Sequence, residues 1–76
     1  MASNTKQHDH HLPALLRLPE VRKLTGLGTT QIYRLARRGE FPQPVKITER
    51  SSAWIESEVR GWIDTRIRAS RDTRAA

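Results

Sequence analysis

The first periodic pattern of apolar residues predicts a short helix that begins at Pro19 and ends at Gly26. Leu16 and Leu18 alternate with a polar residue and predict a short extended lead-in. Proline suits the first helical position because its missing N–H needs no partner there, and glycine is common just past a helix end. The apolar positions of this helix follow a helical spacing: Leu18, Val21 and Leu24.

A second amphipathic segment, residues 29–38, follows a turn that contains Gly26 and Gly28. Gly28 or Thr29 opens this helix, with Thr29 the better side chain for capping its free N–H groups, and Gly39 ends it. Two short helices joined by a glycine-containing turn predict a helix-turn-helix. Apolar residues line one face at the i, i+3 and i+4 positions: Ile32, Leu35 and Ala36.

The segment after Gly39 predicts a minimal β-hairpin. Residues 41–44, Phe-Pro-Gln-Pro, cannot continue a helix. Alternation over residues 45–47 predicts a strand, residues 48–52 a polar turn, and residues 53–55 a returning strand. A hairpin this small is unstable alone, so we expect it to pack on the helices as a wing.

A third helix is predicted from Glu56 or Ser57, because carboxylates favour the first turn of a helix. Gly61 lies inside it at a cost of about 1 kcal/mol relative to alanine, and close packing is one reason for a glycine there. From Arg68 onward the chain is polar and basic, and we expect it to fray. The apolar stripe of this helix is Val59, Trp62, Ile63 and Ile67.

Together these elements predict one domain over residues 15–67, mainly α with a small β-hairpin, in a winged helix-turn-helix arrangement. Residues 1–14 lack periodicity and predict a disordered polar tail, and residues 68–76 a basic, frayed one. The chain has no cysteine and no apolar run that could span a membrane or target it for secretion. We therefore expect a cytoplasmic protein without a membrane partner.

Charge narrows the choice of partner. Fourteen basic and eight acidic residues give a formal net charge of +6, which favours a nucleic acid. The lysines are Lys6, Lys23 and Lys46, and every other basic residue is arginine. Arginine makes two-point contacts with phosphate and with guanine that lysine cannot make.

Residues for catalysis or metal binding are not grouped along the chain. The carboxylates fall in helix starts, turns and exposed positions, and all three histidines lie in the tail, at His8, His10 and His11. No second cluster completes a metal shell, and there is no glycine-rich phosphate loop or paired nucleophile and base. We predict no enzymatic activity, no cofactor, no metal site and no small-molecule substrate.

The polar face of the second helix carries side chains suited to a DNA major groove, with no acidic residue among them. Gln31 can bond adenine at two points, and Arg34 can do the same with guanine or bind a phosphate. Lys46 and Arg50 add positive charge to the wing, although Glu49 lies beside Arg50. The predicted DNA-binding residues are Thr29, Thr30, Gln31, Tyr33, Arg34, Arg37, Arg38, Lys46 and Arg50.

The aromatic residues have a structural interpretation as well. Tyr33 is expected to be partly in the core, with its hydroxyl free to meet a phosphate. Trp54 and Trp62 are expected in the core rather than stacked on bases. Three further basic residues at the first helix are weaker candidates for backbone contacts: Arg17, Arg22 and Lys23.

Five stretches of the chain combine into a specific pattern. They are Leu-Arg-Leu-Pro-Glu-Val at 16–21, Leu-Thr-Gly-Leu at 24–27, Ile-Tyr-Arg-Leu at 32–35, Gly-Glu-Phe-Pro-Gln-Pro-Val-Lys at 39–46, and Trp-Ile-Glu-Ser-Glu-Val at 54–59 followed by Trp-Ile. This pattern resembles the AlpA family of small phage-type transcriptional regulators. The resemblance implies a winged helix-turn-helix similar to MerR and excisionase-like domains, with residues 29–38 as recognition helix and 45–55 as wing.

Two positions depart from that family. Gly28 stands where the family commonly has a capping serine, which leaves Thr29 to cap the recognition helix. The sequence Ile-Thr-Glu-Arg at 47–50 replaces the family's usual glycine-containing turn.

The function predicted from the sequence is a sequence-specific DNA-binding transcriptional regulator of a prophage or integrative element, acting on double-stranded DNA. Self-association on DNA stays open. One alternative is an excisionase-like architectural factor that bends DNA for a recombinase, and another is a protein-interaction adaptor.

Overall fold

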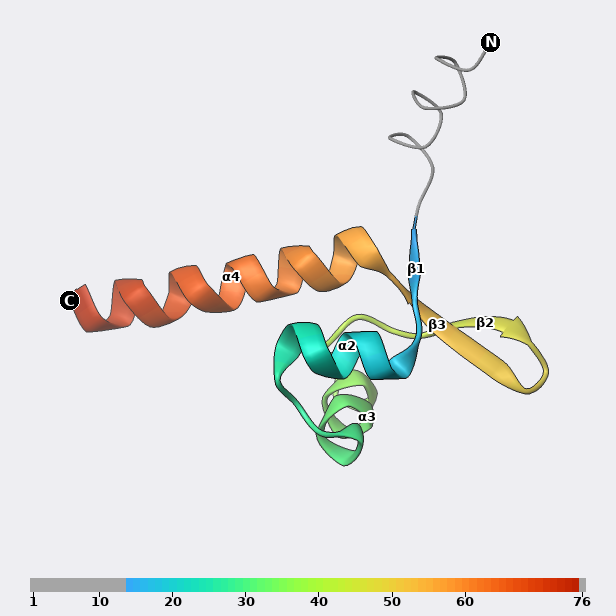
Figure 1. Ribbon diagram of the computed structural model, residues 1–76. Helices are drawn as coiled ribbons and strands as arrows, with labels where there is room; N and C mark the ends of the chain where they lie inside the picture. Colours follow the sequence, from blue (N-terminus) through green and yellow to red (C-terminus); the bar gives the residue numbers. More distant parts are fainter. Residues whose placement is uncertain (1–13, 76) are drawn as a thin grey trace, which may run out of the picture.

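The protein is described here by a computed structural model covering residues 14–75, with side chains described as far as Asp72. Figure 1 shows two short helices beneath a small sheet, with a hairpin and a long helix projecting to opposite sides. The histidine group predicted to bind no metal lies outside the described residues. In chain order the elements are β1 (Leu15–Leu16), α2 (Leu18–Thr25), α3 (Thr29–Arg37), β2 (Val45–Thr48), β3 (Ser51–Ile55) and α4 (Glu56–Ala75).

Helix α2 begins one residue before Pro19, with Arg17 in the N-cap position. The Glu20 carboxylate compensates for the absence of a polar cap, because its Oε1 accepts the Arg17 backbone N–H at 2.9 Å. At the other end Gly26 adopts φ 76°, and its N–H donates to the Arg22 carbonyl at 2.8 Å. This left-handed ending is the one that glycine permits, so α2 stops where the sequence predicted.

Helix α3 begins at Thr29, and its N-cap residue is Gly28. The expectation that Thr29 caps this helix is wrong, because Thr29 already has helical geometry as the first residue of α3. Gly28 has no side chain to offer, so no side-chain hydrogen bond caps the helix.

The end of α3 is a complete Schellman turn. Gly39 adopts φ 76°, its N–H donates to the Ala36 carbonyl at 3.0 Å, and the Glu40 N–H donates to the Leu35 carbonyl at 2.8 Å. These two bonds satisfy carbonyls that a helix end otherwise leaves free. The chain therefore leaves α3 in a defined direction toward the wing.

The sheet has three antiparallel strands in the order β1-β3-β2. The hairpin β2–β3 was predicted, but the pairing of β1 with β3 was not. In that pairing Leu15 lies opposite Ile55 and Leu16 lies opposite Trp54. The extended lead-in predicted before the first helix is thus an edge strand of the sheet.

The wing turn forms without a glycine. Glu49 and Arg50 are its two central residues, and no described residue other than glycine has a positive φ. The Thr48 hydroxyl accepts the Arg50 N–H at 3.2 Å and is hydrogen-bonded to the Ser51 hydroxyl at 2.7 Å. A register shift between Lys46 and Thr48 completes the connection. Side-chain hydrogen bonds and a bulge replace the glycine-containing turn.

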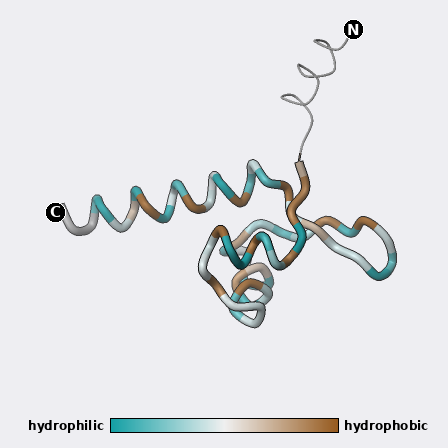
Figure 2. The backbone as a smooth tube through the Cα atoms, viewed as in Figure 1, coloured by the Kyte–Doolittle hydropathy of each residue, from teal (hydrophilic) through white to brown (hydrophobic). Residues whose placement is uncertain are grey.

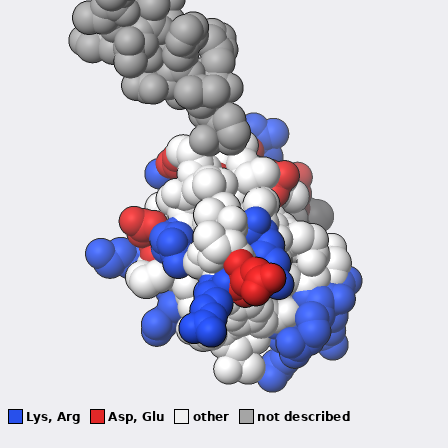
Figure 3. All heavy atoms as spheres, turned by 90° about the vertical axis from the view of Figure 1, so that its right-hand side faces the viewer, with Lys and Arg blue, Asp and Glu red and all other residues white. Residues whose placement is uncertain are grey.

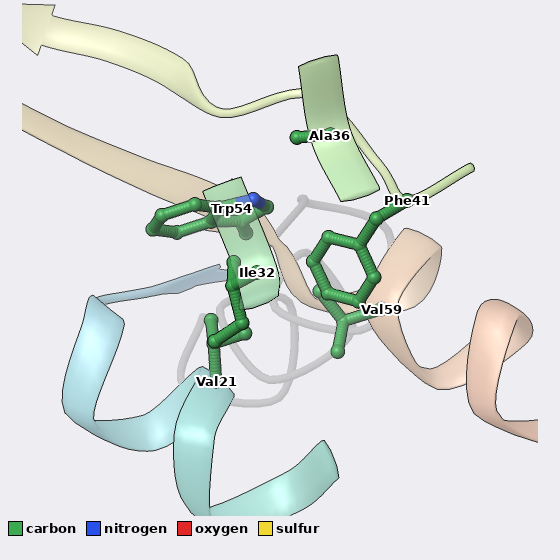
Figure 4. Close-up of a cluster of buried hydrophobic side chains, with 6 residues drawn as sticks. All are labelled: Val21, Ile32, Ala36, Phe41, Trp54 and Val59. Atoms are coloured by element: carbon green, nitrogen blue, oxygen red, sulfur yellow. The ribbon is translucent and has the colours of Figure 1, made fainter. Parts of the chain in front are cut away.

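The core lies where α2, α3, the sheet and the first turns of α4 meet (Figure 4). Trp54 is fully buried at its centre, which confirms its predicted structural role. The half-buried residues Leu16, Leu18 and Leu24 pack against this cluster. Its buried members are Val21, Ile32, Ala36, Phe41, Trp54 and Val59.

Helix α4 runs to Ala75, so the prediction that the chain frays from Arg68 is wrong. An ion pair within the helix, Asp64 to Arg68 at 3.1 Å, supports this extension. Ile67 was expected on the core stripe but is 43% exposed. The C-terminal part of α4 projects away from the other elements (Figure 1). Figure 2 shows that hydrophobic positions become sparse toward the end of α4.

Close packing does not explain Gly61 in α4. A Cβ placed on this residue has no atom within 4 Å outside the local helix backbone. The glycine is therefore a local weak point of the helix rather than a packing requirement.

The arrangement of α2, α3 and the β2–β3 wing confirms the predicted winged helix-turn-helix, mainly helical with a small hairpin. No helix among residues 14–75 is both long and apolar enough to cross a membrane.

Candidate nucleic-acid interface

Helix α3 separates its buried and exposed residues as the sequence predicted. Ile32 and Ala36 are buried against the core. The polar residues on the other side are exposed, and Arg38 follows at the C-cap, also exposed. The exposed predicted residues of this element are Thr29, Thr30, Gln31, Arg34, Arg37 and Arg38.

Tyr33 lies between the exposed face and the core. It is half-buried, and its ring packs 5.8 Å from the Trp54 ring at an interplanar angle of 57°. This contact fixes the ring, as expected for a residue that is partly in the core.

The wing contributes two exposed basic residues, Lys46 on β2 and Arg50 in the turn. The structure brings Arg50 and Tyr33 to the same crevice, which has a volume of about 480 Å³. Lys46 does not line it. Most of the crevice wall comes from Arg17, Pro19, Tyr33, Arg50, Ser52 and Trp54.

Side-chain hydrogen bonds hold the loop between α3 and the wing. Trp62 Nε1 donates to the Glu40 carbonyl at 2.7 Å, and Trp54 Nε1 donates to the Pro42 carbonyl at 3.1 Å. Gln43 Nε2 reaches back to the carbonyl of Ala36 in α3 at 2.6 Å. These bonds position α3 relative to both the wing and α4.

Trp62 has further contacts that hold α4 against the loop. Its ring meets Phe41 edge to face at 4.8 Å, and the Arg66 guanidinium lies 5.0 Å from its centroid. Trp62 is half-buried, so its predicted structural role is confirmed although it is not fully in the core.

The basic groups of α3 and the wing are not neutralised by neighbours. Among the described side chains, residues 14–72, the ion pairs are Glu56–Arg60 and Asp64–Arg68, both within α4. The face seen along the wing carries more basic than acidic side chains (Figure 3). An anionic partner would therefore meet unpaired guanidinium groups here.

Sequence reasoning missed three residues of this region. Gln43 lies seven positions after its partner Ala36, and only the turn at Gly39 brings the two together. The prediction that Ser51 and Ser52 belong to the polar turn is wrong, because both lie in β3, and both line the crevice. A single sequence contains no signal for such contacts, because each depends on how separate elements pack.

The described part of the chain contains no group of three or more His, Cys, Asp or Glu side chains that could hold a metal ion.

Comparison with known proteins assigns this chain to a family. The family model described as prophage CP4-57 regulatory protein (AlpA) matches residues 14–67. The uncharacterised protein ORF88 of Enterobacteria phage P4 is 50% identical over 44 residues, which cover 58% of this chain. The chain spans about half the length of that relative, since the match covers 50% of it. Because the family model covers more than half of the chain, the protein belongs to the AlpA family of prophage regulatory proteins.

Proposed function

We propose that this protein binds double-stranded DNA sequence-specifically and regulates transcription in a prophage or integrative element. Helix α3 enters the major groove, and the β2–β3 wing contacts the adjacent backbone or minor groove. The proposal includes the cytoplasmic location predicted from the sequence and assigns the protein no catalytic step.

The exposed face of α3 is the observation that carries this proposal. It presents two threonines, a glutamine and three arginines without an acidic residue, while the opposite face is buried. Arginine and glutamine are the side chains that read guanine and adenine edges at two points. An ordinary solvated helix face would be expected to carry charges of both signs.

The size of α3 is also suitable. An α-helix with its side chains is about 10–12 Å across, which matches the width of about 12 Å of the major groove. Thr29 and Thr30 lie at the N-terminal end, where backbone N–H groups favour phosphate oxygens.

Selection of bound sequences from random duplex DNA, followed by variant binding, tests the proposal. Gln31→Ala and Arg34→Ala should each cost about 1–3 kcal/mol on the selected site and relax the preference at one base pair. Arg68→Ala on α4 is the charge-matched control for Arg34, and it should leave the sequence preference unchanged. Equal losses on selected and random DNA would show that α3 does not read bases.

The selected DNA site also allows the alternative functions to be distinguished. Circular-permutation gel shifts with the selected site would reveal the strong bend expected of an excisionase-like factor. A straight complex would support a regulator that reads DNA without bending it. Negligible binding to any duplex at low salt would instead favour a protein-interaction adaptor.

A further inference from the structure

The crevice between α2, α3 and the wing is lined by hydroxyl and aromatic side chains as well as by arginines. Its walls come from three separate elements: Arg17 precedes α2, Tyr33 belongs to α3, and Arg50 and Ser52 belong to the wing. Trp54 of β3 also lines it. The crevice is therefore a junction that exists only when all three elements are packed together.

Every charged group that lines the crevice is a cation, and the uncharged polar side chains are hydroxyls. Neither Arg17 nor Arg50 is in an ion pair within the described part of the chain. The nearest acidic residues in sequence, Glu20 and Glu49, do not line it. Glu20 instead accepts the Arg17 backbone N–H, which leaves the guanidinium available.

Such a set of donors fits an anion with several oxygen atoms. Its position between the exposed face of α3 and the wing identifies the anion. A DNA strand bordering a groove occupied by α3 would pass this junction on its way to the wing. We propose that the crevice holds one phosphate of the DNA backbone, shared by Arg17, Tyr33 and Arg50, with the Ser52 hydroxyl as a further donor.

This inference rests on the proposed DNA binding and adds a mechanism for orientation. The Tyr33 ring is fixed against Trp54 at 5.8 Å, so its hydroxyl is held by the core rather than by a flexible chain. Arg50 is fixed at its backbone, because its N–H donates to the Thr48 hydroxyl at 3.2 Å. A phosphate held by both residues sets the depth and angle at which α3 enters the groove.

Replacing one backbone phosphate at a time with a neutral analogue tests whether Arg17, Tyr33 and Arg50 bind the same phosphate. Duplexes of the selected site are made with one methylphosphonate at each successive backbone position, and affinities are measured for the wild-type chain and for Arg17→Ala, Tyr33→Phe and Arg50→Ala. Tyr33→Phe keeps the ring that packs on Trp54, and the two arginines are exposed, so folding is preserved. Arg71→Ala is the matched control, because it removes the same charge from exposed α4 surface outside the crevice.

We expect one backbone position at which the methylphosphonate weakens wild-type binding about tenfold, the size of a charge-assisted hydrogen bond. At that position Arg17→Ala and Arg50→Ala should lose no more than about twofold further, because their shared partner is already gone. Tyr33→Phe should show the same coupling, while Arg71→Ala should keep the full sensitivity to the methylphosphonate.

Two results would overturn the shared site. If Arg17 and Arg50 are coupled to different phosphates, the two residues make separate contacts. If Arg17 is coupled to no phosphate, Arg17 is not part of the interface. In both cases the wild-type chain still prefers its selected site, so the proposed function stands. Absence of sequence preference in the wild-type chain is a different failure, and it refutes the proposed function itself.

Discussion

Replacing Gly61 with alanine should stabilise the protein, whereas the same change at Gly39 should destabilise it. Both residues would place a new Cβ in open space, with no atom within 4 Å. They differ in backbone conformation, because Gly39 has φ 76° and Gly61 is an ordinary helical residue. The sign of each effect therefore depends on the backbone and not on packing.

The magnitudes follow from that difference. In a helix interior alanine is favoured over glycine by about 1 kcal/mol. Gly61 lies between Val59 and Ile63, which pack in or against the core, so this gain adds to global stability. At Gly39 a side chain in the left-handed region costs about 1–2 kcal/mol, offset by about 0.4–1 kcal/mol from the restricted unfolded chain. The expected net change at Gly39 is a loss on the order of 1 kcal/mol.

Urea unfolding monitored by tryptophan fluorescence and circular dichroism measures both variants. The buried Trp54 reports on the core, and the m-value should stay constant if only stability changes. In thermal unfolding, 1 kcal/mol corresponds to roughly 4–8 °C for a domain of this size. A Gly61→Ala variant less stable than wild type would refute the open-space interpretation. A neutral Gly39→Ala variant would refute the Schellman turn.

Three further changes test other parts of the fold. Gly28→Ser should stabilise the protein by a few tenths of a kcal/mol, because it supplies the missing N-cap hydroxyl at a φ of −83° that any residue can adopt; a lower melting temperature would contradict this. Gln43→Ala should cost about 1 kcal/mol in urea unfolding, because it removes the 2.6 Å bond to the Ala36 carbonyl; unchanged stability would show that water replaces the amide. Arg60→Ala should change stability by less than about 0.5 kcal/mol, since its pair with Glu56 is exposed; a larger loss would mean that the pair supports α4 cooperatively.

The elements that the sequence predicted correctly are those with local signals. The apolar spacing of Ile32 and Ala36 and the stop at Gly39 all lie within a few residues of one another. These signals fix a helix and its exposed face without knowledge of the rest of the chain. The exposed positions of the candidate interface could be predicted for the same reason.

The parts that could not be predicted depend on contacts between distant residues or on helix length. Strand β1 has two residues, too few for any periodicity, and forms because Leu16 pairs with Trp54 far along the chain. The extension of α4 beyond Ile67 could not be predicted from an apolar stripe, because the stripe ends there. A polar helix can continue without one where pairs such as Asp64–Arg68 support it.

The residues that carry the family pattern mostly hold helix α3 in place rather than form its exposed face. Gly39 makes the turn that ends α3, and Phe41 is buried beside it. Trp54 and Trp62 bind the carbonyls of the loop that follows. By contrast, the side chain of Gln31 is exposed and makes no hydrogen bond among the described residues. Exposed positions on α3 can therefore change without disturbing the bonds that orient the helix. Under the proposed DNA-binding function, relatives with the same scaffold are expected to recognise different DNA sites.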